Sequence, residues 1–392
     1  MSQRSRQEYL KRIWPRYQGG GRKHRQLILN EFCTNCEYDR KYAIKLLNRP
    51  LGGRQRPPGP EATYGEAELE VLAYLWRQTD YLCSKRLKAA LPIWLPHYER
   101  HQGPLSPAVR ERLAQVSPAT IDRLLAPVRA KAAPHGRCGT RPGTLLRTQI
   151  PIRAEEWNVH EPGYLEADTV AHCGGSLAGN FVWSITYTDI WTGWTESRAI
   201  WNKGFEGVLT QTRELEAILP FPILAFDCDN GGEFLNYHLV RYFQKRKRPV
   251  TFTRSRPYHK DDNAHVEQKN WMHVRQLFGY DRFENQELIK LMNDLYRQEW
   301  FWFRNFFCPS MKLIHKERIK SRWVKKHDEP ATPYQRLLQW QGLNAEKRQA
   351  LEKLYQQLDP IAVKAAIERK LKRIFALVHP QRFPPRADLP AA

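Results

Sequence analysis

Several features of an exported or membrane protein are missing from this chain of 392 residues. No apolar run approaches the roughly 18 residues that a membrane-spanning helix requires. The opening "MSQRSRQEYLKR" lacks the apolar core of a signal peptide, and the seven cysteines, an odd number, do not favour a disulfide framework. We therefore expect a cytoplasmic protein with reduced thiols and no membrane contact.

Acidic residues are few relative to basic residues. Lysine and arginine number 63 against 41 aspartates and glutamates, giving a formal net charge of +22 and a pI near 9.8. The excess is clustered, since residues 1–56 hold 14 basic and 4 acidic side chains, and residues 241–260 hold 8 basic and none acidic. Cations that contact phosphates release condensed counterions, so this charge favours a nucleic acid as partner. A basic surface without such a role is the alternative.

The sequence contains two pairs of residue types that can bind zinc. Cys33 and Cys36 form a Cys-x-x-Cys pair, and His97 and His101 form a His-x-x-x-His pair. Zinc sites normally bring two such pairs together over a shorter interval than the sixty residues here. We therefore expect no zinc site, with the cysteines at a helix end and the histidines on a helix surface.

Residues 1–50 have the pattern of short helices and predict a first helix-turn-helix module. The helices correspond to "RKHRQLILNEF" and "DRKYAIKLLN", with a turn around "CTNCEY" between them. In the second helix the apolar residues are Ala43, Ile44, Leu46 and Leu47, and the cations left outside, our candidate DNA contacts, are Arg40, Lys41 and Lys45. Residues 51–63 are a Pro/Gly/Arg-rich linker.

A second helical module is predicted over residues 64–131. Its clearest boundary is "VSPATIDRLL", where Ser117 suits the N-cap and Pro118 the first helical position. Ile121, Leu124 and Leu125 form an apolar stripe, which leaves Thr120 and Arg123 on the exposed face as candidate DNA contacts. Many small helical bundles share this pattern, so a purely structural module is the alternative. Residues 132–160 form a basic linker.

From residue 161 to 282 the pattern changes to strands and helices. Three strands, "YLEADTVAH", "NFVWSITYTD" and "GWTESRAIWN", are followed by a helix, the strand "FPILAFDCD", a helix, the strand "PVTFT" and a helix from about Asn263 to Phe278. This order predicts an α/β domain with a mixed sheet. Residues 283–380 are expected to be mainly helical, and residues 381–392 to be a disordered tail. The chain is thus multidomain, and no internal repeat is visible.

Three carboxylates stand at the ends of these elements. Asp168 closes the strand "YLEAD", Asp229 closes "ILAFDCD", and Glu267 lies one turn into the helix that begins near "DDNAHVEQKNW". If the first and fourth strands are neighbours in the sheet, the three side chains converge. Such a cluster is unfavourable unless a hard cation lies between its members, and magnesium prefers oxygen ligands of this kind.

The motifs "EADTV", "DCDNGGEF" and "DNAHVEQKN" resemble the catalytic core of DDE transposases and retroviral integrases, which has a ribonuclease-H-like fold. The resemblance covers residues 160–280 most strongly. Outside it, "EYDRKYAIKLLN" and the segment 305–338 look like the flanking regions of bacterial insertion-sequence transposases. It implies that Asp168, Asp229 and Glu267 are the catalytic residues and hold Mg²⁺ or Mn²⁺, with two ions expected.

The family resemblance also implies an activity and partners. The expected enzyme binds the terminal repeats of its own element, cleaves there, and joins the freed 3′ hydroxyl to target DNA without a covalent enzyme intermediate. Its partners are double-stranded DNA and further copies of itself, at least as a dimer on DNA. The alternatives are a structure-selective nuclease on the same fold and a non-catalytic DNA-binding repressor derived from a transposase.

Neighbouring acids are given other roles. Asp227 is expected to be a supporting or surface acid, because Asp229 is the aspartate directly before Asn-Gly, and Glu233 is expected to favour a helix N-terminus by its charge. Glu166 and Asp189 are interpreted as structural. Asp261 and Asp262 are assigned to a loop.

Candidate phosphate contacts lie in and after the loop "TRSRPYHKDDNAH". The loop contributes Arg254, Arg256 and Lys260, and the following helix contributes Lys269 and Arg275. A solvated basic face explains each helix cation equally well. Trp271 is expected to pack, with base stacking as the alternative.

Overall fold

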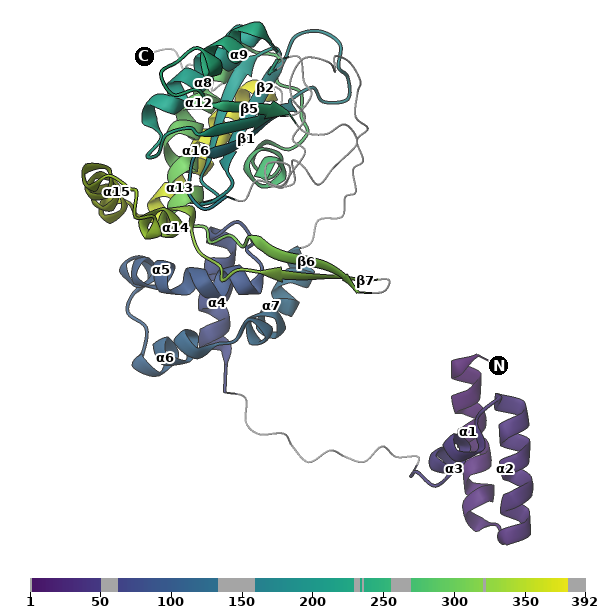
Figure 1. Ribbon diagram of the computed structural model, residues 1–392. Helices are drawn as coiled ribbons and strands as arrows, with labels where there is room; N and C mark the ends of the chain where they lie inside the picture. Colours follow the sequence, from purple (N-terminus) through teal and green to yellow (C-terminus); the bar gives the residue numbers. More distant parts are fainter. Residues whose placement is uncertain are drawn as a thin grey trace, which may run out of the picture. The chain divides into compact units, whose positions relative to one another are not determined.

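The computed structural model describes residues 2–50, 63–132, 159–228, 233–234, 236–254, 269–319 and 322–379. The chain divides into two compact units, Met1–Thr63 and Tyr64–Ala392 (Figure 1). The division falls at the end of the linker predicted over residues 51–63. The finer domain bounds remain predictions.

The first unit consists of three helices, α1 (Gln3–Gly19), α2 (Arg22–Cys36) and α3 (Arg40–Leu47). Phe32, Ala43 and Leu47 are fully buried in a core that belongs to this unit alone. Asp39 ends the preceding turn, because its carboxylate accepts hydrogen bonds from the first amides of α3. The turn is shorter than expected: α2 continues to Cys36, so only residues 37–39 lie between the two helices.

The second unit begins with four helices, α4 (Glu66–Gln78), α5 (Ser84–Gln102), α6 (Pro107–Gln115) and α7 (Pro118–Ala132). The predicted boundary at Ser117 is confirmed, since the amide of Thr120 donates to the Ser117 hydroxyl at 3.1 Å. Ile121 and Leu125 are fully buried, as the apolar stripe predicted.

A five-stranded sheet forms the centre of the second unit. Its strands are β1 (Tyr164–Ala171), β2 (Val182–Asp189), β3 (Thr195–Trp201), β4 (Ala225–Cys228) and β5 (Thr251–Arg254), in the spatial order β3-β2-β1-β4-β5. β2 is antiparallel to both of its neighbours, β1 and β3, whereas β4 and β5 run parallel to β1. The predicted mixed sheet is confirmed. The first and fourth strands are neighbours, which is the condition under which the sequence predicts that the carboxylates converge.

Helices cover both faces of this sheet (Figure 1). On one face, Tyr187 of β2 contacts Thr212 of α8 (Phe205–Ile218), and α9 (Tyr237–Gln244) packs beside β5. On the other face, Ser184 of β2 bonds Tyr296. The two β2 residues are three positions apart, so they point to opposite faces. Tyr296 begins a continuous run of the π-helix η2 (Tyr296–Trp300) and α13 (Phe301–Phe306), which follows α12 (Glu287–Leu295).

The remaining elements complete the C-terminal region. The π-helix η1 (Trp271–Arg275) and α11 (Gln276–Phe278) precede α12, and α14 (Pro333–Gln339), α15 (Ala345–Gln357) and α16 (Pro360–Val378) end the described chain. Between α13 and α14 lies an antiparallel hairpin, β6 (Leu313–Ile319) and β7 (Arg322–His327). The described part of the region predicted to be mainly helical, residues 283–380, is helical apart from this hairpin, which the sequence did not predict. Its sequence, "LIHKERIKSRWVKKH", has too many charges for a clean strand alternation.

Buried aromatic side chains join the second unit's helical block to its C-terminal region. Trp94 of α5 is fully buried, and its ring centroid lies 6.1 Å from that of Phe303 and 6.3 Å from that of Phe307. Its indole nitrogen donates to the Phe307 carbonyl at 2.9 Å. The helical block is therefore part of the same core as the sheet. None of the helices in the described part of the chain is long and apolar enough to cross a membrane.

Candidate active site

Asp168 lies within the central strand β1 and is half-buried; the strand continues to Ala171, which corrects the expectation that Asp168 closes it. One carboxylate oxygen accepts a hydrogen bond from the Thr169 amide at 2.7 Å, and the other accepts one from the Asn270 side-chain amide at 2.6 Å. Asn270 directly precedes η1 and is 8% exposed. A contact between the sheet and the C-terminal helices therefore orients the first of the predicted catalytic carboxylates.

Two further acids share the sheet face of Asp168. Glu166 precedes it by two positions on β1 and pairs in register with Asp227 of β4. Both are fully buried, and the Asp227 carboxylate accepts a hydrogen bond from the Thr253 hydroxyl at 2.5 Å. Asp227 is thus an interior residue, which corrects the alternative that placed it on the surface.

The other two predicted catalytic residues, Asp229 and Glu267, lie outside the described residues, as do Asp261 and Asp262. Their positions in the sequence are informative. Asp229 follows Cys228, the last residue of β4, and Glu267 precedes Asn270 by three positions. Within the described ranges, no group of three histidine, cysteine, aspartate or glutamate side chains could hold a metal ion.

Glu233 has a different role from the one expected. Its carboxylate is buried, accepts a hydrogen bond from the Thr169 hydroxyl at 2.8 Å and forms an ion pair with Lys203 at 2.8 Å. The N-cap of α9 is Asn236, whose side chain accepts from the Leu239 amide. Glu233 therefore fixes the residue after Asp168 and does not cap the helix.

Asp189 is structural, as interpreted from the sequence. Its buried carboxylate accepts hydrogen bonds from the Gly163 amide and from both the amide and the hydroxyl of Thr192. Burial raises the pKa of this carboxyl group above its usual value, and the three hydrogen bonds offset part of that rise. It holds the turn between β2 and β3.

Two of the candidate DNA contacts, Arg254 and Lys269, are buried, which contradicts the expectation that they contact phosphates at the surface. Lys269 is 9% exposed and donates to the Gly193 carbonyl at 3.2 Å, and Arg254 is 4% exposed. Burial, with the nearby guanidinium charges of Arg304, Arg86 and Arg336, lowers the pKa of Lys269 to about 7. Neither side chain presents its charge at the surface.

The remaining candidates divide by exposure. Arg275 is half-buried, and its guanidinium carbon lies 4.8 Å from the centroid of the Tyr280 ring. Trp271 is 55% exposed, so the expectation that it packs in the interior is wrong. Arg256 and Lys260 lie outside the described residues. The candidate cations on the helical modules are all exposed: Arg40, Lys41, Lys45 and Arg123. Arg123 donates to the hydroxyl of half-buried Thr120 at 3.0 Å.

The Cys-x-x-Cys and His-x-x-x-His pairs lie on two separate helices, α2 and α5. Cys36 is the buried last residue of α2, with Cys33 half-buried in the same helical turn. On α5, His101 lies 2.8 Å and His97 3.7 Å from one carboxylate oxygen of Asp359. The two histidines thus contact the N-cap residue of α16.

Sequence reasoning missed two features. Asn270 carries no signal in a single sequence, because its importance lies in a contact with a strand 102 residues earlier. The second is a basic groove between α8 and α9, for which the sequence offered one indication, the charge excess over residues 241–260.

Comparison with known proteins establishes a family. The chain is 39% identical over 341 residues to a Sinorhizobium fredii (strain NBRC 101917 / NGR234) protein named "Uncharacterized protein y4rM", a match that covers 86% of this chain and 96% of that protein. The chain belongs to the same family as y4rM. No model of a known protein family matches it. Among solved structures, it is similar to the catalytic core domain of BIV integrase, with a TM-score of 0.29 and 16% identity over 45% of this chain and 94% of that one.

Proposed function

We propose that this protein is a DNA transposase that cleaves the ends of its own element and joins them to target DNA. The observation that carries the proposal is the parallel pairing of β1 and β4, with Ala167 opposite Cys228. In the sequence, Asp168 and Asp229 directly follow these paired residues. Two of the three carboxylates in the transposase-like motifs therefore belong to residues that directly follow a register pair of neighbouring strands.

Covalent geometry limits how far apart the three carboxylates can be. Paired strands lie about 4.8 Å apart, and consecutive Cα atoms are about 3.8 Å apart, so the Cα atoms of Asp168 and Asp229 are separated by at most about 12 Å. Three residues span at most about 11 Å, which keeps Glu267 near Asn270. Because Asn270 bonds Asp168, this limit supports a common site for all three residues.

The donor set fits Mg²⁺ or Mn²⁺, since all three side chains offer carboxylate oxygens and none offers sulfur or nitrogen. We propose that Asp168, Asp229 and Glu267 hold two such ions. When bound, the ions would activate the attacking oxygen and stabilise the leaving one. The chain's own part is to position the carboxylates, through the Asn270 and Thr169 hydrogen bonds to Asp168 and the Glu233 contact to Thr169.

The proposed partner is double-stranded DNA, bound by at least two copies of the chain. The formal charge of +22 favours a polyanion, and α3 presents Arg40, Lys41 and Lys45 on its exposed side. The unit that contains α3 has its own core, as a separate sequence-reading module requires. We propose this module for end recognition.

The proposal is tested by incubating the protein with labelled element ends and target DNA in Mg²⁺. A transposase yields joined products. A nuclease yields cuts without joining, and a repressor yields a shifted band with neither, so either result would replace the proposed function.

A further inference from the structure

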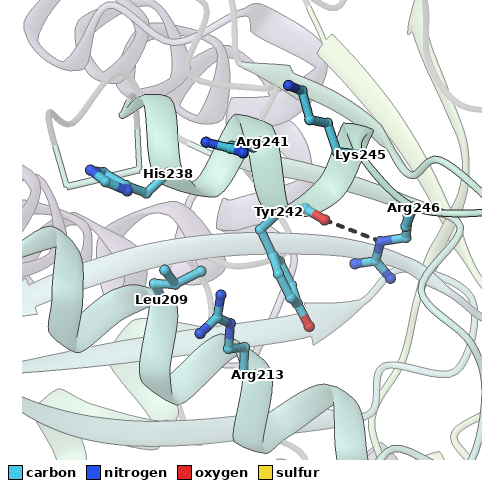
Figure 2. Close-up of a pocket in the computed structure, with 7 residues that line it drawn as sticks. All are labelled: Leu209, Arg213, His238, Arg241, Tyr242, Lys245 and Arg246. Carbon is cyan, nitrogen blue, oxygen red and sulfur yellow. Dashed lines mark hydrogen bonds between the residues drawn. The ribbon is translucent and has the colours of Figure 1, made fainter.

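A groove between α8 and α9 is lined by seven side chains, of which four are arginine or lysine (Figure 2). Its volume is about 580 Å³. The helix α8 contacts Tyr187, whereas Asp168 pairs in register with Thr186, so the groove and Asp168 lie on opposite faces of the sheet. The lining residues are Leu209, Arg213, His238, Arg241, Tyr242, Lys245 and Arg246.

Three of the cations are exposed and have no ion pair among the described residues: Arg213 on one wall, and Arg241 and Lys245 on the other. Arg246 differs, because both its terminal nitrogens contact Glu216, at 2.5 and 3.2 Å. Like charges that line one groove repel one another unless an anion lies between them. The groove therefore favours an anionic ligand.

The cations form an extended row. His238, Arg241 and Lys245 are spaced three and four residues apart, so they lie along one side of α9 and its C-terminal end. This row is about 10 Å long, and a duplex of that length carries about six phosphate charges. Arg213 of α8 faces the row from the other wall, as Figure 2 shows. A polyphosphate backbone matches this arrangement better than a single anion.

The Tyr242 ring of the groove is not open for base stacking. The guanidinium groups of Arg213 and Arg246 lie 5.2 and 4.8 Å from the Tyr242 ring centroid, and Figure 2 shows the ring between them. The Tyr242 hydroxyl bonds Glu216. Stacking on free aromatic faces is the usual device for holding single strands. Because both neighbouring guanidinium groups lie over the Tyr242 ring, the groove is better suited to a duplex contacted through phosphates.

We propose that this groove binds the backbone of duplex DNA independently of sequence, as a second DNA-contacting surface on the sheet face opposite Asp168. The inference rests on the proposed function, because it supplies that enzyme with a hold on DNA away from the reacting ends. A purely local role for the cations is the competing explanation. Arg241 lies in the last turn of α9 and Lys245 is its C-cap, where positive charge stabilises the helix dipole.

The test compares two triple variants of the full chain with the wild type. The groove variant is Arg213→Gln, Arg241→Gln, Lys245→Gln. The control variant has the same charge change at exposed positions of α15 and α16, Lys353→Gln, Arg369→Gln, Lys372→Gln. Binding to a labelled duplex of random sequence is measured by fluorescence anisotropy over a range of salt concentrations, with inorganic phosphate and polyglutamate as competitors.

Each lost phosphate contact lowers the slope of log affinity against log salt by about 0.9, so the groove variant should lose a slope of about 2.7. Between 50 and 200 mM salt the wild type should then lose about 40-fold more affinity than this variant. The control should keep the wild-type slope, and inorganic phosphate should compete poorly.

Equal slopes in the groove and control variants would overturn the inference. A lower melting temperature with unchanged slope would assign the cations to the helix dipole instead, and stronger competition by polyglutamate than by unlabelled duplex would assign the groove to an acidic protein. Strand transfer is measured beside binding. If the wild type binds through the groove but neither cuts nor joins DNA, the proposed function fails and the groove assignment holds.

Discussion

Replacing Asn270 by alanine tests whether its hydrogen bond positions Asp168 for chemistry. The bond is 2.6 Å long, joins an amide to a carboxylate, and lies where Asn270 is only 8% exposed. Hydrogen bonds to charged groups contribute about 1.5–3 kcal/mol, so the free energy of unfolding should fall by about 2 kcal/mol. Loss of a side chain that orients a metal ligand typically lowers activity by about 10–100-fold, and we expect a loss of strand transfer in that range.

Asn293 provides a matched control. It is 7% exposed, and its side chain exchanges two hydrogen bonds with the Ala199 backbone, at 2.7 and 2.9 Å. Ala199 pairs with Ser184, which pairs with Val170, so the contact lies on the sheet face of Asp168 but on the edge strand β3. Asn293→Ala should cost at least as much stability as Asn270→Ala while leaving the activity per folded molecule near the wild-type value.

The assay combines urea unfolding, followed by tryptophan fluorescence, with strand transfer normalised to folded protein. Full activity in Asn270→Ala, despite the expected loss of stability, would refute the positioning role. Equal activity losses in Asn270→Ala and Asn293→Ala would refute it as well, because they would trace the effect to a loosened fold.

Three further predictions concern stability and folding. Burial, with a smaller contribution from the charge of Arg275, lowers the pKa of His172 to about 3, so between about pH 6.5 and 3 the unfolded chain binds a proton that the folded chain does not. The stabilisation by neutral His172 is therefore fully present above pH 6.5, and its loss should lower the free energy of unfolding by about 2 kcal/mol by pH 5. Urea titrations should show that the free energy of unfolding of His172→Gln does not fall by this amount. An equal fall in the variant would contradict the assignment of this pH dependence to His172. Residues 1–50 should fold alone, with a helical circular dichroism spectrum, because this unit has a core of its own. A fragment of residues 64–132 should aggregate, because it exposes Trp94, which packs against Phe303 in the full chain. A monomeric, cooperatively melting 64–132 fragment would argue against the packing of Trp94 on the C-terminal region. The wild-type melting temperature should rise with Mg²⁺ or Mn²⁺ and that of Asp168→Asn should rise less, and identical responses would remove Asp168 from the metal site.

Local signals explain what the sequence predicted correctly. Ser117 and Asp39 carry side chains that bond the first amides of a helix, so those helix starts are encoded within a few residues. The order of strands and helices between residues 161 and 282 predicts a mixed sheet but does not decide which strands are neighbours, so the pairing of β1 with β4 was only a condition of the predicted site.

The rest depends on contacts between distant residues. Lys269 and Arg254 looked like surface cations because their burial comes from elements far away in the chain, such as the turn at Gly193. The hairpin β6–β7 was missed because its sequence lacks the period-two alternation of a half-buried strand. The Asn270 contact could not be foreseen from spacing, since amides form comparable bonds throughout proteins.

The most direct test of the central claim is strand transfer of labelled element ends by four single variants. The account predicts that Asp168→Asn, Asp229→Asn and Glu267→Gln abolish cleavage and joining while end binding stays close to wild type, because each removes a proposed metal ligand and no sequence-reading contact. Asp227→Asn should keep most activity, since an amide oxygen can still accept the Thr253 hydrogen bond. Activity in Asp229→Asn together with inactivity in Asp227→Asn would show that the wrong aspartate was assigned, and activity in all four variants would contradict the carboxylate site altogether.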